Sequence, residues 1–214
     1  MSTHLAASQT PHDRPDASAP LSDQLDAWLT GDGDKTLGGL TDVFQEKSFA
    51  ILFVLLLGVS ALPIPTGGAT HVFDVIAVLT AAQLIIGREH PWIPQRWMGL
   101  NLGGPKQQKF ISALLKAIRW LERFSRPRMA WIFDHPLTNA AFGLVVIAFT
   151  AGAFFAPPFS GLDTLPALGV VLVSLGVLLE DVVIVAVGLV VGVAGIVAEI
   201  VLGKAAVNGL GKLF

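Results

Sequence analysis

The chain has 214 residues, of which 53% are hydrophobic and only 14% are charged, and its net charge of −2 conceals a strong segregation of charge along the sequence. Soluble domains carry about 25% charged residues, so this composition points to the lipid bilayer. The absence of cysteine excludes disulfides, thiolate nucleophiles and cysteine-ligated metals.

The N-terminal region divides into a polar tail and an acidic amphipathic segment. Residues 1–20 are rich in Ser, Pro, Ala and Asp, which is typical of a disordered tail. Residues 21–47 form the acidic segment, which we place in the cytoplasm. Apolar side chains recur on one face of a short helix there: Leu21, Leu25, Trp28 and Leu29. Because the polar face of this helix is acidic, we expect it to pack on protein and not on anionic lipid.

Five apolar runs follow, at residues 48–62, 72–87, 140–156, 165–179 and 182–203. A helix needs about 20 apolar residues to cross a hydrocarbon core of ~30 Å, and only the last run meets that length comfortably. The sequence therefore predicts an all-α integral membrane protein. Its predicted parts are two membrane hairpins (48–88 and 140–181), a C-terminal transmembrane helix (182–203) and a short tail (204–214).

The two hairpins are predicted to be an internal repeat, because a shift of 93 residues aligns residues 48–88 with 141–181 without a gap. Prolines break each hairpin: Pro63, Pro65, Pro157 and Pro158. Proline lacks the backbone N–H that a continuing helix needs. The breaks are either turns at the aqueous surface or re-entrant tips around a binding site, as in transporter folds.

Positive charge is concentrated in the connection between the hairpins. Nine of the fourteen Lys and Arg residues lie between Arg88 and Arg128. By the positive-inside bias, residues 89–139 are a cytoplasmic or interfacial linker, the hairpin tips point outward and the N-terminus is cytoplasmic. Within the linker, "KFISALLKAIRWLERF" predicts a basic amphipathic helix lying on the inner leaflet. The basic residues expected to meet anionic lipid are Arg119, Arg123, Arg126 and Arg128. Because lipid accounts for this cluster, we expect no nucleic-acid partner.

Four polar residues near the apolar runs are candidate functional residues: Asp74, Gln83, Glu180 and Asp181. An ionisable group at membrane depth is by default a functional hypothesis. Each of the first two also has a purely structural explanation. Asp74 would be a carboxylate favoured in the first turn of a helix, and Gln83 would form a hydrogen bond to a neighbouring helix. The acidic pair is either a cytoplasmic turn or a buried site that takes up protons or cations.

Two further acidic residues have structural explanations, and no enzyme motif stands out. Asp163 is expected to cap the following helix, and Glu199 is expected to lie at the membrane interface. The sequence holds no nucleophile elbow, Walker loop or metal-ligand spacing. We therefore expect no catalytic residues, no cofactor and no metal site.

Four stretches in succession resemble the exopolysaccharide-synthesis ExoD family of bacterial membrane proteins: "ALPIPTGG", "QLIIGREHPWIPQRW", "WLERFSRPRMAWI" and "TLPALGVVLVSLGVLLED". The resemblance implies a cytoplasmic-membrane protein linked to exopolysaccharide production, and it brings no established reaction. The family positions that it carries over are Pro63, Pro65, Gln83, Gly87, Pro91, Trp92, Pro94, Glu122, Pro127, Arg128, Pro166, Gly176 and Asp181.

The predicted function is a non-catalytic accessory role in exopolysaccharide synthesis or export, in the bacterial cytoplasmic membrane. The alternative is a small membrane carrier of ions or lipid-linked sugar, with its site at the two hairpin breaks. The predicted partners are the bilayer and its anionic inner-leaflet lipids. Membrane proteins of polysaccharide synthesis and further copies of this chain are left open as protein partners.

Overall fold

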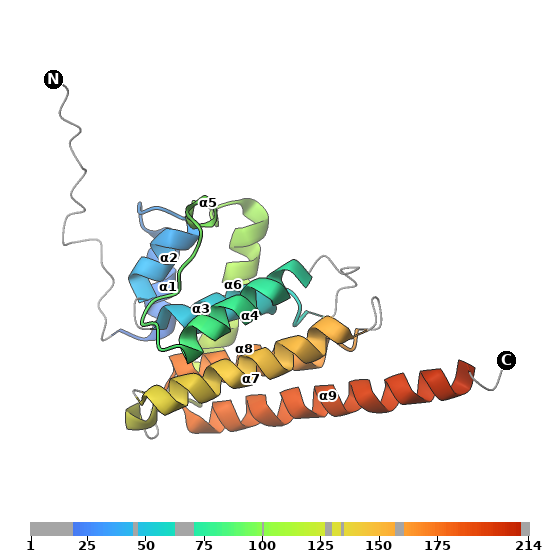
Figure 1. Cartoon of the computed structure of the whole chain (residues 1–214). Helices are drawn as coiled ribbons and strands as arrows, with labels where there is room; N and C mark the ends of the chain where they lie inside the picture. Colours follow the sequence, from blue (N-terminus) through green and yellow to red (C-terminus); the bar gives the residue numbers. More distant parts are fainter. Residues whose placement is uncertain are drawn as a thin grey trace. The chain divides into compact units, whose positions relative to one another are not determined.

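A computed structural model describes residues 19–44, 47–62, 71–99, 101–126, 130–133, 135–156 and 161–210. This described part is helical and contains no strand, which confirms the all-α prediction for it (Figure 1). The hairpin prolines and Arg128 lie outside the described residues. The chain divides into two compact units, each assembled from two separate stretches of sequence.

The first unit combines residues 1–43 with residues 94–123. Its helices are α1 (Leu21–Thr30), α2 (Leu37–Phe44), α5 (Gln95–Met98) and α6 (Pro105–Glu122). The apolar face of α1 is buried and α1 packs against α6, so the predicted packing of this segment on protein is confirmed. The stretch before α2 meets the stretch after α5 in an isolated antiparallel bridge between Thr36 and Asn101.

The predicted helix of the basic linker is α6, and its apolar side is covered by protein. Ile111, Leu114, Leu115 and Ile118 are all buried. We expect an interfacial helix to insert its apolar face into lipid, but here protein covers that face. The basic residues of α6 remain exposed, for example Arg119 and Arg123. The prediction that remains is that the basic side of α6 contacts anionic lipid.

The second unit combines residues 44–93 with residues 124–214. Its helices are α3 (Ser48–Gly58), α4 (His71–Ile85), α7 (Pro136–Phe155), α8 (Thr164–Leu178) and α9 (Val182–Leu210), with a short 3-10 turn, η3 (Ala130–Ile132). The main packing pairs are α4 with α7, α3 with α8, and α8 with α9. Helix α3 is apolar and buried almost all round, as expected of a core helix.

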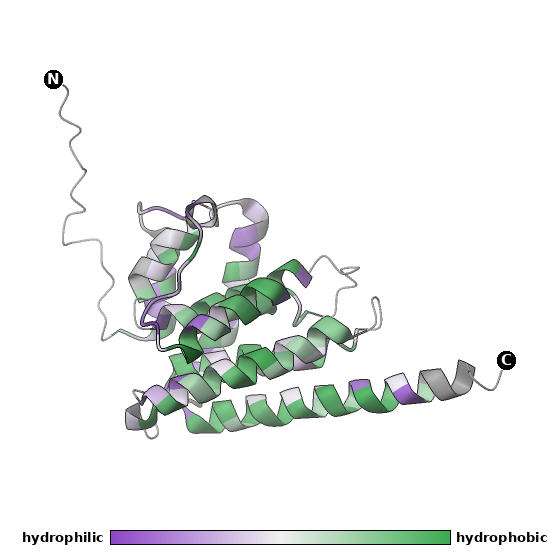
Figure 2. Ribbon diagram, in the orientation of Figure 1, coloured by the Kyte–Doolittle hydropathy of each residue, from purple (hydrophilic) through white to green (hydrophobic). Residues whose placement is uncertain are grey.

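Two helices of the described part are long and apolar enough to cross a membrane, judged by length and composition: α7 and residues Val182–Ala205 of α9. Figure 2 shows apolar residues along most of α9. This helix ends at Leu210 and not at Gly203, so it is longer than predicted. Helices α3, α4 and α8 are apolar but shorter.

Glycines bring α8 and α9 into close contact. A Cβ atom placed on Gly188 would lie 2.6 Å from the backbone nitrogen of Val173, and one on Gly195 would lie 2.6 Å from Cδ of Pro166. Small residues allow helix backbones to approach in this way. The GxxxG motif therefore has partners in the same chain: Gly188 lies against α8, and Gly192 lies against Gly169 of α8 and the ring of Phe149 of α7.

Candidate functional site

The acidic turn between α8 and α9 is held by hydrogen bonds from backbone groups. Asp181 is only 1% exposed. Its Oδ1 accepts the N–H of Val183 at 2.9 Å, and its Oδ2 accepts the N–H of Arg126 at 2.9 Å. Val183 lies in the first turn of α9, where N–H groups lack helical partners. Asp181 thus caps α9 and ties the chain that follows α6 to this turn, which supports the structural alternative.

Glu180 adopts a backbone conformation that usually requires glycine. Its φ is 53°. Its N–H donates to the carbonyl of Val177 at 3.2 Å, while the N–H of Asp181 donates to that of Gly176 at 2.9 Å. This pair of bonds is a Schellman motif that ends α8, with Glu180 at its left-handed position. The geometry is that of a helix stop.

Lys47 secures the same turn from the start of α3. Its Nζ donates to Oε1 of Glu180 at 2.7 Å and to the carbonyl of Leu178 at 3.1 Å. Leu178 is the last residue of α8, so its carbonyl lies at the negative end of the helix dipole, where a cation is favourable. Of the predicted acidic pair, Glu180 binds a lysine and Asp181 binds backbone N–H groups, contacts that favour a structural turn.

Gln83 binds backbone and not a neighbouring helix, contrary to our expectation. Its Oε1 accepts the N–H of Trp92 at 2.7 Å, and its Nε2 donates to the carbonyl of the same residue at 3.4 Å. The chain reverses between them at Gly87, whose φ of 86° suits glycine. Gln83 therefore fixes the segment that leaves α4.

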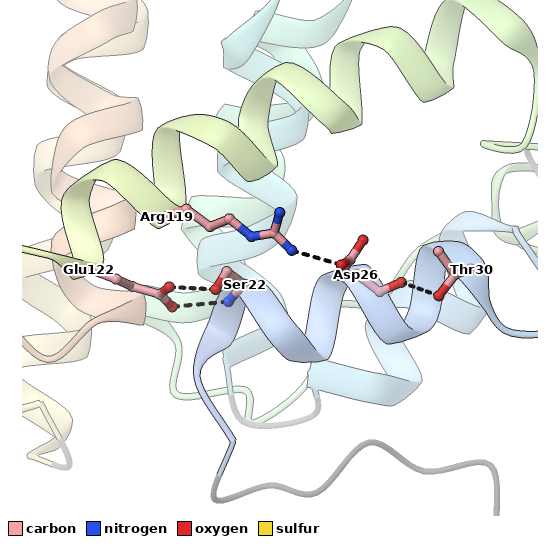
Figure 3. Close-up of polar contacts among 5 residues, drawn as sticks. All are labelled: Ser22, Asp26, Thr30, Arg119 and Glu122. Atoms are coloured by element: carbon pink, nitrogen blue, oxygen red, sulfur yellow. Dashed lines mark hydrogen bonds and ion pairs between the residues drawn. The ribbon is translucent and has the colours of Figure 1, made fainter.

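In the first unit, Glu122 also binds groups at the start of a helix, as Figure 3 shows. Its Oε1 accepts the N–H of Ser22 at 2.9 Å and its Oε2 accepts the hydroxyl of the same residue. A carboxylate is favourable there because the first N–H groups of α1 lack partners. One turn along, Arg119 binds Asp26 at 2.7 Å. This predicted lipid-binding arginine therefore also holds α1 and α6 together.

Asp74 is the candidate residue that, unlike Gln83 and Asp181, forms no hydrogen bond to a backbone group among the described residues. It lies in the first turn of α4, as predicted, and is 2% exposed. Its Oδ2 lies 3.2 Å from Nδ1 of His71. Its Oδ1 is buried and has no hydrogen-bond partner among the described residues. The His71 ring in turn lies against the ring of Phe154, with 4.9 Å between centroids.

The structure separates Asp74 from the acidic turn and brings it near a second carboxylate, that of Asp163. Asp163 lies within electrostatic range of both Asp74 and Glu199. Asp163 is the N-cap residue of α8, as predicted, but its side chain makes no capping hydrogen bond. The sequence offered a signal for this grouping, since Asp163 and Glu199 are ionisable residues in otherwise apolar stretches. In the described residues, no three His or acidic side chains are placed to hold a metal ion.

These features define an all-helical protein with two candidate membrane helices, whose conspicuous polar side chains mostly secure helix ends. Its sequence matches, over residues 21–201, the family described as exopolysaccharide synthesis, ExoD. The chain belongs to this family. The resemblance seen in the sequence is thereby confirmed, and membership implies involvement in exopolysaccharide synthesis.

Two relatives are similar over most of the chain. Protein ExoD of Rhizobium meliloti is 28% identical over 196 residues, which cover 89% of this chain and 80% of the relative. An uncharacterized protein of Synechocystis sp. is 30% identical over 161 residues, which cover 75% of this chain and 72% of the relative. No solved structure matches this sequence.

Proposed function

We propose that this protein is a multi-pass component of the bacterial cytoplasmic membrane that assists exopolysaccharide synthesis or export without catalysing a reaction. The observation that carries the proposal is the two-sided character of α9. Its glycine side packs on α8. Valines at 183, 187, 190 and 197 on its other side are each at least 50% exposed. A stripe of this kind on a helix of membrane length suits lipid contact.

We infer further that the two hairpins are an internal repeat. Helices α4 and α8 both have 15 residues, and they begin at His71 and Thr164, which are 93 positions apart. Each ends in a Schellman motif, with Gly87 and Glu180 at equivalent positions. The packing pairs α4 with α7 and α3 with α8 are also exchanged by the repeat. These correspondences support a pseudo-two-fold arrangement.

The lengths of these helices bear on how deeply the hairpins enter the membrane. A 15-residue helix extends about 22 Å, which is less than the ~30 Å of a hydrocarbon core. Helices α4 and α8 alone therefore do not reach across. This supports hairpins whose proline-broken connections complete the crossing or stop within it. The N-terminus and the basic linker lie in the cytoplasm in this arrangement.

The accessory role is supported by what the polar residues do. Asp181, Gln83 and Glu122 each bind backbone groups of the same chain. Exposed arginines of the linker, such as Arg123 and Arg126, are available for anionic lipid or for a partner. Membrane proteins of polysaccharide synthesis are the partners that suit this role best, and a second copy of the chain is the other.

The proposal is tested by deleting the gene in its own host. We expect the tagged protein to sediment with the membrane fraction and the deletion strain to secrete less exopolysaccharide per cell. Restoring the wild-type gene should restore secretion. Unchanged secretion in the deletion strain would overturn the proposed role, and recovery of the protein in the soluble fraction without detergent would overturn the location.

A charge swap separates the internal role of Arg119 from a role in binding. Arg119→Asp alone breaks the ion pair with Asp26, whereas Arg119→Asp with Asp26→Arg restores a pair of opposite charges. If the arginine serves only α1 and α6, the swap should recover exopolysaccharide secretion. If lipid or a partner binds this arginine, as the accessory role requires of the basic side of α6, secretion should stay low in the swapped protein.

A further inference from the structure

The apolar stretches of the second unit contain very few ionisable residues. Residues 48–87, 140–179 and 182–203 hold four in total: His71, Asp74, Asp163 and Glu199. Glu199 is expected by sequence to be interfacial, and Asp163 to be a cap. The structure places all four at one end of the unit, where α4 and α8 begin and α7 ends.

The register of α4 against α7 places two buried oxygen atoms at the same level. The His71 ring lies against the Phe154 ring at a tilt of 55°, and a Cβ atom on Gly143 would lie 3.0 Å from the carbonyl of Ala81. These two contacts fix an antiparallel register that puts Asp74 at the level of Thr150. Both Oδ1 of Asp74 and Oγ1 of Thr150 are buried without a hydrogen-bond partner in the described structure. Unpaired polar atoms at matching depth are unusual and call for an explanation.

Helix α9 brings a third element to this place. Gly195 lies against Pro166 at the start of α8. One turn further along, Oε2 of Glu199 lies 3.4 Å from the position that a Cβ atom on Gly152 of α7 would take. Oε1 of Glu199 is buried and has no partner among the described residues. The charge of Asp163 reaches both Glu199 and Asp74.

A buried ionised carboxylate with an unpaired oxygen is strongly disfavoured, and nearby negative charges disfavour it further. A proton removes both costs, because it neutralises the carboxyl and converts one oxygen into a donor for a neighbouring acceptor. A metal ion would need several ligands, and no such set is present in the described residues. We propose that Asp74 is a proton-binding site, which exchanges its proton with water through the partly exposed His71.

Groups from several helices lie around Asp74. His71 lies on its own helix and is its hydrogen-bond partner. Asp163 at the start of α8 adds negative charge nearby, and Phe154 of α7 lies against His71. Glu199 of α9 lies against α7 at the same end of the unit. Residues 63–70 and 157–160 contain no ionisable residue in the sequence. This proposal is independent of the polysaccharide role, because it concerns protonation of a carboxyl in the protein itself.

Dicyclohexylcarbodiimide tests the proposal on the full-length wild-type protein in liposomes. This apolar reagent adds to protonated carboxyl groups in apolar surroundings and leaves a stable N-acylurea that peptide mass spectrometry can locate. We expect an adduct on Asp74 whose yield declines from acidic to alkaline buffer. Asp181 is the matched control, because it is equally buried and both of its oxygens accept backbone N–H groups. It should remain unmodified.

Variants and a second measurement make every outcome decisive. His71→Ala removes the side chain that can donate to Asp74 and stabilise its ionised form, so the yield of adduct on Asp74 should rise at a given pH. Infrared difference spectra of wild type against Asp74→Asn should show the carbonyl band of a protonated carboxyl at neutral pH. An unmodified Asp74 beside a modified Glu199, a yield that does not change with pH, or the absence of that infrared band would each overturn the proposal.

Discussion

Single polar residues in this protein act mainly on backbone groups at helix ends. Gln83 holds the chain after α4, Glu122 caps α1, and Asp181 caps α9. The ends of a helix leave N–H and C=O groups without partners, and in apolar surroundings these groups cannot all turn to water. The sequence singles out these residues because they interrupt apolar stretches. It does not reveal that their partners are backbone atoms.

The left-handed conformation of Glu180 leads to a prediction about stability. We expect Glu180→Gly to have a free energy of unfolding about 1 kcal/mol higher than Glu180→Ala, because only glycine adopts a positive φ without steric cost. Both variants lose the ion pair with Lys47 equally, so that loss cancels in the comparison. Denaturant unfolding in detergent, followed by circular dichroism, measures the difference. Equal stabilities would show that the turn is not strained.

The composition of a segment determines that it forms a helix, but the shape of the helix surface determines which other helix packs against it. In α9, Gly188 and Gly195 lie against α8, whereas the valines at 183, 187, 190 and 197 are at least half exposed. Both residue types are apolar, so hydropathy alone does not distinguish the two sides. The spacing of Gly188 and Gly192 indicates a close contact, and only the packed structure shows that α8 and Phe149 of α7 make it.

A pair of glycine substitutions measures this packing. Gly203→Ala should raise the free energy of unfolding by up to about 1 kcal/mol, because alanine favours the helix and no atom lies within 4 Å of the added methyl group. Gly188→Ala should lower it by roughly 1–3 kcal/mol, because its methyl group would overlap the backbone of Val173. Thermal unfolding of the two variants in the same detergent compares them. A stabilising effect at both positions would contradict close packing of α8 on α9.

At the scale of the whole molecule, sequence neighbours are divided between the two units. The basic linker is not one structural piece, because residues 94–123 belong with the N-terminal segment while residues 124–139 belong with the apolar helices. The acidic face of α1 meets the basic face of α6 across a long separation in sequence, for example in the pair of Asp26 and Arg119. Opposite charges in two distant segments thus contribute to one small helical unit.

Because the chain lacks cysteine, its orientation can be measured with single introduced cysteines. We expect Gly33→Cys, in the first unit, to react with a membrane-impermeant thiol reagent only after cells are permeabilised. Ala205→Cys, which follows a crossing by α9 from the cytoplasmic turn, should react in intact cells. Both positions are exposed, so accessibility within the protein is matched. Reaction of both cysteines in intact cells, or of neither, would contradict a single crossing by α9.

The sequence by itself determined the helical class, the apolar stretches, the helix breaks near the hairpin prolines and the family. These properties follow from local composition and periodicity, because a helix and its apolar face are encoded within about twenty residues. The tertiary structure alone decided that the apolar side of α6 is covered, that Gln83 and Asp181 bind backbone, and that Asp74 lies near Asp163. Those outcomes depend on contacts between side chains from distant segments. Such side chains pack according to their shape and charge, which a local sequence pattern does not reveal.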